Sequence, residues 1–125
     1  MADGKTVFFD RDGTIMHDAN YCSDPKDVHV FPFTAQSLRR LKAEGYKLIM
    51  VTNQSGIGRG YFTREQYNAV HAEVLRQIGE SLIDATYVCP DVPGTESKCR
   101  KPAPGMILQG AREHGLWGRP QARRP

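Results

Sequence analysis

The chain has 125 residues, which is enough for one domain around a single hydrophobic core. Hydrophobic residues make up 39% of the sequence and charged residues 25%, and no apolar stretch reaches the roughly 18 to 20 residues that cross a bilayer, which excludes a membrane span. The formal net charge is +3, but arginines cluster near the C-terminus, so the charge gives little support for a nucleic-acid-binding surface.

The first predicted element is a buried strand at residues 7–9 that delivers two carboxylates to a loop. Its apolar residues are followed by Asp10 and Asp12, and Gly13 then breaks the strand. A carboxylate at the end of an apolar strand is costly unless a cation or hydrogen-bond donors compensate it, and two of them need a partner such as Mg²⁺. One aspartate could attack as a nucleophile while the other moves a proton. Taken alone, the segment is equally compatible with an ordinary turn that carries two aspartates.

Apolar runs and helical periodicity divide the rest of the chain into alternating helices and strands. The helix expected after Thr63 has a capping box, because Gln66 stands three residues after the threonine. Strands that alternate with helices predict an α/β domain with a mostly parallel sheet. The elements expected after the first strand are a helix at 34–44, a strand at 47–52, the helix that begins after Thr63, a strand at 85–89 and a helix at 106–114, with loops at 53–61 and 90–104.

Polar residues follow each of the three predicted strands. In a parallel sheet, ligands bind beyond the carboxyl ends of the strands, so these residues are expected to lie close together. They offer two acids, hydroxyl and amide donors and two cations, which are the groups needed to hold a phosphoryl group while a carboxylate attacks it. In chain order they are Asp10 and Asp12, then Thr52, Asn53, Gln54 and Ser55, and finally Arg100 and Lys101.

Three motifs in this order resemble the haloacid dehalogenase superfamily of phosphotransferases. They are Phe9–Thr14, Val51–Gly60 and Cys99–Met106, and together they are far more specific than any one of them. Within the superfamily they resemble the small-capped branch that contains the D-glycero-D-manno-heptose 1,7-bisphosphate phosphatases and the histidinol-phosphate phosphatases. The resemblance implies a Rossmann-like parallel sheet with flanking helices, and we expect the phosphatase domain to span residues 1–116.

The resemblance also implies catalytic roles. Asp10 would be the nucleophile that becomes an aspartyl-phosphate, and Asp12 the general acid that protonates the leaving alkoxide. Both would contact Mg²⁺, Asp12 through its backbone carbonyl. Thr52 and Lys101 would stabilise the transferring phosphoryl group, although taken singly a strand cap and a solvated lysine explain these two residues equally well. The residues expected to contact the substrate are Arg11, Asp18, Tyr21, Asn53, Gln54, Ser55 and Arg100.

The sequence departs from this branch in the loop after the third predicted strand. The branch often carries a zinc clip there, and the four matching positions in this chain are Cys89, Asp91, Ser97 and Cys99. Structural zinc sites use thiolates and imidazoles, and a serine hydroxyl is a poor ligand, which argues against zinc at Cys89, Asp91 and Cys99. The three cysteines are also odd in number and follow no export signal, which argues against a disulfide framework and favours a cytoplasmic protein.

A second departure is that no Asp or Glu follows Glu113, whereas the family has an acidic fourth motif on a later strand. We expect the C-terminal strands of the fold to be missing, as in a truncated or frameshifted gene or a fragment. Mg²⁺ binding should then weaken, and the first strand would become a sheet edge open to self-association. Residues 117–125 fit neither helical nor strand periodicity and are expected to form a disordered basic tail.

These features predict a Mg²⁺-dependent phosphatase of small phosphorylated metabolites, by ancestry a D-glycero-D-manno-heptose 1,7-bisphosphate 7-phosphatase. A histidinol-phosphate phosphatase is an alternative from the same branch. A polynucleotide 3′-phosphatase shares the same motif pieces, but the sequence has no contiguous aromatic and basic groove for nucleic acid. A catalytically impaired remnant that binds phosphate or self-associates remains the alternative from another class.

Overall fold

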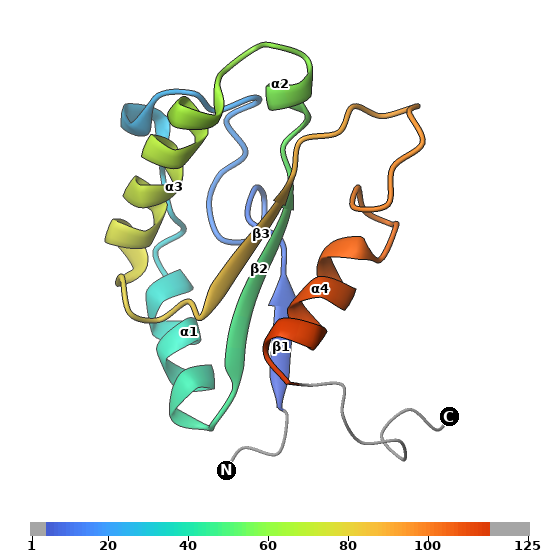
Figure 1. Ribbon diagram of the computed structural model, residues 1–125. Helices are drawn as coiled ribbons and strands as arrows, with labels where there is room; N and C mark the ends of the chain where they lie inside the picture. The colour runs from blue at the N-terminus through green and yellow to red at the C-terminus, as the bar shows by residue number, and fades with distance from the viewer. Residues whose placement is uncertain (1–4, 116–125) are drawn as a thin grey trace.

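The computed structural model describes residues 5–115 and shows a three-stranded parallel sheet flanked by helices (Figure 1). The strand order is β1 (Thr6–Phe9), β2 (Lys47–Asn53) and β3 (Ala85–Cys89). This confirms the predicted α/β class with a parallel sheet. The expected tail at 117–125 lies outside the described residues. The helices are α1 (Thr34–Ala43), α2 (Ser55–Gly58), α3 (Arg64–Ile78) and α4 (Gly105–Glu113), with a short 3-10 helix η1 (Pro25–Asp27).

Strand β2 is central among the described strands, and its side chains alternate between two hydrophobic cores. Leu48 and Met50 face the core formed with α1 and α3, whereas Ile49 and Val51 face the core formed with α4. The two helical layers lie on opposite sides of the sheet (Figure 1). Because helices cover both faces of β2, its sequence is a continuous apolar run and not an alternating pattern, as is typical of a strand in a parallel sheet.

Helix α3 begins as the capping box predicts. The Thr63 hydroxyl accepts a hydrogen bond from the Gln66 backbone N–H at 3.0 Å, and the Gln66 side chain accepts one from the Thr63 N–H at 2.8 Å. These two bonds satisfy donors that the first turn of a helix leaves without an internal partner. The remaining bounds differ from the predicted ones by about one residue, which is within the usual fraying of helix and strand ends.

The short helix α2 lies inside the segment that was expected to be a loop. Its sequence contains two glycines, which are poor helix formers, so local propensity gives no indication of it. Tertiary contacts hold it instead: the Gly58 N–H donates to the Pro90 carbonyl at 3.1 Å, and a side chain at Gly58 would collide with that same carbonyl. The turn therefore places the end of β2 against the loop that follows β3.

No helix among residues 5–115 is both long enough and apolar enough to cross a membrane.

Candidate active site

A polar pocket of about 230 Å³ lies at the carboxyl ends of the strands, next to α2. This is the edge of the sheet at which the sequence predicted a site. Several expected site residues line it, as do Asn20 and Gly56, which lie within the stretches expected to contribute to the site. The lining residues are Asp12, Asp18, Asn20, Tyr21, Asn53, Gln54, Ser55 and Gly56.

Asp10 directly follows β1 and forms an ion pair with Lys101 from the loop after β3. The Lys101 Nζ lies 2.9 Å from Asp10 Oδ1 and also donates to the backbone carbonyl of Val51 at 3.0 Å. The Arg11 backbone N–H donates to the same Asp10 oxygen at 2.9 Å. Among residues 5–115 these contacts of the Asp10 carboxylate all involve Oδ1 and leave Oδ2 without a partner.

Asn53 fixes the backbone that carries Lys101. Its Oδ1 accepts a hydrogen bond from the Lys101 N–H at 3.0 Å, and its Nδ2 donates to the Lys101 carbonyl at 3.4 Å. A side-chain amide that binds both backbone groups of one residue ties the end of β2 to the loop after β3. The lysine expected to stabilise a phosphoryl group is therefore held by β2.

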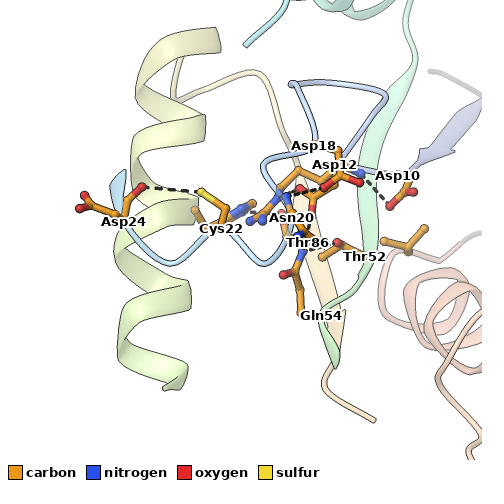
Figure 2. Close-up of polar contacts among 12 residues, drawn as sticks. Asp10, Asp12, Asp18, Asn20, Cys22, Asp24, Thr52, Gln54 and Thr86 are labelled. Carbon is orange, nitrogen blue, oxygen red and sulfur yellow. Dashed lines mark hydrogen bonds and ion pairs between the residues drawn. The ribbon is translucent and has the colours of Figure 1, made fainter. Parts of the chain in front are cut away.

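Asp12 is held by a different pair of donors. The Arg11 Nε donates to Asp12 Oδ1 at 2.8 Å, and the Gln54 Nε2 donates to Asp12 Oδ2 at 3.2 Å. Gln54 also donates to the hydroxyl of Thr52 at 2.8 Å, which joins the ends of β1 and β2 (Figure 2). Asp10 and Asp12 thus pair with different cations, Lys101 and Arg11, through different donor atoms.

Arg11 is fully buried, with its guanidinium 5.5 Å from the ring centre of Tyr67 on α3. The guanidinium therefore faces the interior of the protein, and the role of Arg11 in substrate binding stays a prediction. Gln54 is 4% exposed and Thr52 0% exposed. Burying polar groups costs free energy unless they are hydrogen-bonded. The side chains of Gln54 and Thr52 meet this need by bonding to each other.

The loop after β1 forms another side of the pocket. Asp18 accepts a hydrogen bond from the Asn20 N–H at 2.9 Å, and Asn20 and Tyr21 have φ values of 56° and 63°. Consecutive residues other than glycine in this left-handed region are strained and are often found at functional sites. The exposed Tyr21 ring meets the Tyr61 ring edge-on with centres 4.8 Å apart. Asp18 and Tyr21 were expected site residues, but the sequence gives no indication of the contact between Tyr21 and Tyr61, because it joins two loops.

Arg100 points into its own loop. Its Nη1 donates to the Asp91 carbonyl at 3.3 Å, and its backbone N–H donates to the Ser97 hydroxyl at 2.9 Å. The structure therefore places Lys101, but not the guanidinium of Arg100, in contact with Asp10. The role of Arg100 in substrate binding stays a prediction.

A disulfide joins Cys89 at the end of β3 to Cys99 in this loop, and the expectation that the chain has no disulfide was wrong. That expectation rested on the odd number of cysteines and on the expected cytoplasmic compartment. The fold brings the Cα atoms of Cys89 and Cys99 to 5.6 Å from each other, a distance typical of disulfides, and leaves Cys22 buried as a free thiol. Residue spacing alone could not show this approach, because it depends on the path of the loop.

The disulfide also affects whether the loop after β3 can bind zinc. Cys89, Asp91 and Cys99 place their potential ligand atoms within 4.8 Å of one another, so the loop does gather the expected positions. Zinc binds deprotonated thiolates, and the sulfur atoms of a disulfide are not thiolates. The oxidised loop therefore does not fit zinc.

Magnesium fits the donors around Asp10 better. Mg²⁺ prefers hard oxygen ligands and usually keeps several waters, binding through one or two carboxylates and a substrate phosphate. The Asp10 side chain is 45% exposed and the Asp12 side chain 26% exposed, so oxygen donors at the end of β1 can be reached from solvent. This set is small but chemically suited to Mg²⁺.

The parallel sheet, with two aspartates after β1, a threonine at the end of β2 and a lysine after β3, defines a hydrolase domain of the haloacid dehalogenase type. The family model described as Polynucleotide kinase 3 phosphatase matches residues 5–115. A Thermoplasma volcanium protein named Probable D-glycero-D-manno-heptose-1,7-bisphosphate 7-phosphatase is 43% identical over 107 residues, covering 84% of this chain and 73% of that protein. A Helicobacter pylori strain J99 protein named D-glycero-beta-D-manno-heptose-1,7-bisphosphate 7-phosphatase is 40% identical over 116 residues, covering 90% and 66%.

Solved structures agree with these relatives. The crystal structure of the D,D-heptose 1,7-bisphosphate phosphatase from B. bronchiseptica, complexed with magnesium and phosphate, is 32% identical with a TM-score of 0.81, covering 89% of this chain and 64% of that one. The chain therefore belongs to the haloacid dehalogenase-like hydrolase superfamily, in the branch of the heptose bisphosphate phosphatases. It spans about two thirds of the length of these relatives.

Proposed function

We propose that the chain is a Mg²⁺-dependent phosphatase that acts through an aspartyl-phosphate on Asp10. The observation that carries this proposal is the separate placement of the two aspartates. Asp10 has a lysine at one carboxylate oxygen and a free second oxygen, whereas Asp12 is fixed beside the pocket by Arg11 and Gln54. A nucleophile and a proton donor with these supports are what two-step phosphoryl transfer needs.

In the first step, Oδ2 of Asp10 attacks the phosphorus atom of the substrate ester. The bond between phosphorus and the ester oxygen breaks, and a proton from Asp12 goes to the departing oxygen, which leaves as an alcohol. The Lys101 ammonium offsets the negative charge on the phosphoryl oxygens, and the Thr52 hydroxyl is a further donor at the end of β2.

In the second step, a water molecule attacks the phosphorus atom of the aspartyl-phosphate. Asp12, now a carboxylate, accepts a proton from that water. The acyl-phosphate bond breaks, which releases inorganic phosphate and restores the Asp10 carboxylate. Magnesium, held by Asp10 and the backbone carbonyl of Asp12, would supply shielding of the negative charges when bound.

The proposed substrate is D-glycero-D-manno-heptose 1,7-bisphosphate, with hydrolysis at the 7-phosphate. The names of the relatives support this choice. A small phosphorylated sugar is also consistent with a pocket of about 230 Å³ that is lined by polar side chains. Histidinol phosphate is the alternative within the same branch, and the description of the matching family model makes a 3′-phosphorylated oligonucleotide the second candidate.

Phosphate release by the purified chain with Mg²⁺ tests this proposal, using each of these three substrates in parallel. We expect the highest kcat/KM with the heptose bisphosphate and none above background for Asp10→Asn. Faster release from the oligonucleotide would favour the second candidate. Folded protein that binds phosphate but releases none from any substrate would indicate a non-catalytic remnant.

A further inference from the structure

Arg11 is the most unusual charged residue of the described chain. It is 0% exposed, and its only side-chain ion pair among residues 5–115 is the one between its Nε and Asp12 Oδ1 at 2.8 Å. The two Nη groups are buried without a hydrogen-bond partner in the described part of the protein. Burying a guanidinium with so few partners is expensive and gives little net stability, so stability alone does not explain a buried arginine at this position.

The surroundings of Arg11 hold it rigidly. Its backbone carbonyl accepts hydrogen bonds from the N–H groups of Thr14 and Ile15 at 3.2 and 2.9 Å. Its guanidinium lies over the ring of Tyr67, which is 4% exposed and belongs to α3. An arginine fixed at both ends is a good support for a neighbouring side chain, because its planar guanidinium presents donors in fixed directions.

The Asp12 carboxylate is consequently held at both oxygens. Arg11 binds Oδ1, and Gln54, which is bonded to Thr52, binds Oδ2. A proton donor works only within hydrogen-bond reach of the departing oxygen, so proton transfer depends on the orientation of this carboxylate. Arg11 itself is too deeply buried to touch a ligand in the pocket.

We propose that Arg11 is a positioning residue, which acts through Asp12 and not through the substrate. This inference rests on the proposed phosphatase function, in which Asp12 delivers a proton to the departing oxygen. Loss of Arg11 should free the Asp12 side chain to rotate. It should therefore slow the release of leaving groups that need protonation, while good leaving groups depart without it.

The test compares two substrates in wild type and Arg11→Met, a variant that keeps an apolar side chain of similar length. With heptose bisphosphate, an alkyl ester, we expect kcat to fall by about 100-fold and KM to change by less than about threefold. With p-nitrophenyl phosphate, whose phenolate leaves readily, we expect a fall of less than about fivefold. Val74→Ala, a buried change on α3, is the control for general destabilisation and should affect both substrates equally.

Two outcomes would overturn the inference. An equal loss on both esters would mean that Arg11 only supports the fold, and a raised KM with unchanged kcat would mean that it contacts substrate. If Arg11→Met does not fold, Arg11→Lys serves in its place, because it keeps the buried cation and removes the Nε–H donor.

A crystal structure of the same variant gives a readout that does not depend on turnover. We expect the Asp12 carboxylate to lose its wild-type orientation, and an unchanged orientation would contradict the proposal. Wild-type protein that is inactive on both esters would overturn the proposed function, whereas the crystal structure would still decide whether Arg11 orients Asp12.

Discussion

The ammonium group of Lys101 lies between the Asp10 carboxylate and the backbone carbonyl of Val51, with both partners within 3.0 Å of it. These contacts fix the charge beside the proposed nucleophile instead of leaving it in solvent. A preorganised cation needs no rearrangement as negative charge moves onto the phosphoryl oxygens. The same ion pair occupies Oδ1 of Asp10, whereas Oδ2 has no partner within residues 5–115.

Replacing this lysine tests its role. We expect Lys101→Met to lower kcat/KM by about 100-fold or more, because a fixed donor to the developing charge is lost. The side chain is 27% exposed, so the fold should tolerate the change. Lys98→Met, in the exposed part of the same loop, is the matched control and should keep wild-type activity. Comparable losses in both variants would argue against the assigned role.

His71 provides a prediction about pH and stability. Its Nε2 lies 3.0 Å from the Thr86 hydroxyl, and burial, together with the positive charge of Arg11, lowers its pKa to about 4. In the unfolded chain the ordinary pKa is about 6.5, so below that pH the unfolded state binds the proton and the folded state does not. Stability that is present above pH 6.5 is therefore lost as the pH falls toward 4.

We expect the free energy of unfolding of wild type to fall by about 2 to 3 kcal/mol more than that of His71→Gln between pH 7 and pH 4.5. Glutamine can still bond to Thr86 but does not titrate, and the carboxylates common to both proteins cancel in the comparison. Urea unfolding at the two pH values measures the difference. Parallel losses in the two proteins would show that His71 is not buried in its neutral form.

At the scale of elements, the N-terminus of α3 was the feature most readily predicted. The capping box at Thr63 is a local pattern of four residues, and its bonds formed as expected. We expect Thr63→Ala to lower the free energy of unfolding by about 1 kcal/mol, and Thr63→Ser to keep most of it, because serine also caps. Equal stability of the alanine and serine variants in urea would contradict a role for the hydroxyl.

The loop after β3 was predicted less well. Its disulfide and its hydrogen bonds to β2 join residues that only the folded path brings together. The cysteines in this loop are separated by ten positions, and reduction should lower the free energy of unfolding by about 2 to 3 kcal/mol. Dithiothreitol with urea unfolding measures this loss.

Cys99→Ala serves as the control for reduction, because dithiothreitol should not change its stability further. A thiol count of three in the native, unreduced protein would contradict the disulfide. Equal losses of stability on reduction in wild type and in Cys99→Ala would also contradict the disulfide, because the variant has no bond between these positions to break.

At the scale of the whole molecule, periodicity identified the strands and helices, and the parallel sheet followed from their alternation. The expected position of the site came from strand direction alone, and a polar pocket lies at that edge of the sheet. The pairing of side chains could not be predicted in this way. The placement of Arg11, bonded to Asp12 and over Tyr67 of α3, depends on packing between segments far apart in the sequence. Helix α2 was missed for the same reason, since it is held by contacts with the loop after β3.

The measurement that tests the account most directly is detection of the phosphorylated enzyme. The chain is mixed with heptose bisphosphate and Mg²⁺, quenched in acid within one turnover and digested for mass spectrometry. We predict a phosphoryl group on Asp10, and neither this adduct nor phosphate release in Asp10→Asn. The assignment of Asp10 as the nucleophile would be contradicted if the wild type released phosphate without an adduct on Asp10 and the Asp10→Asn variant still released phosphate.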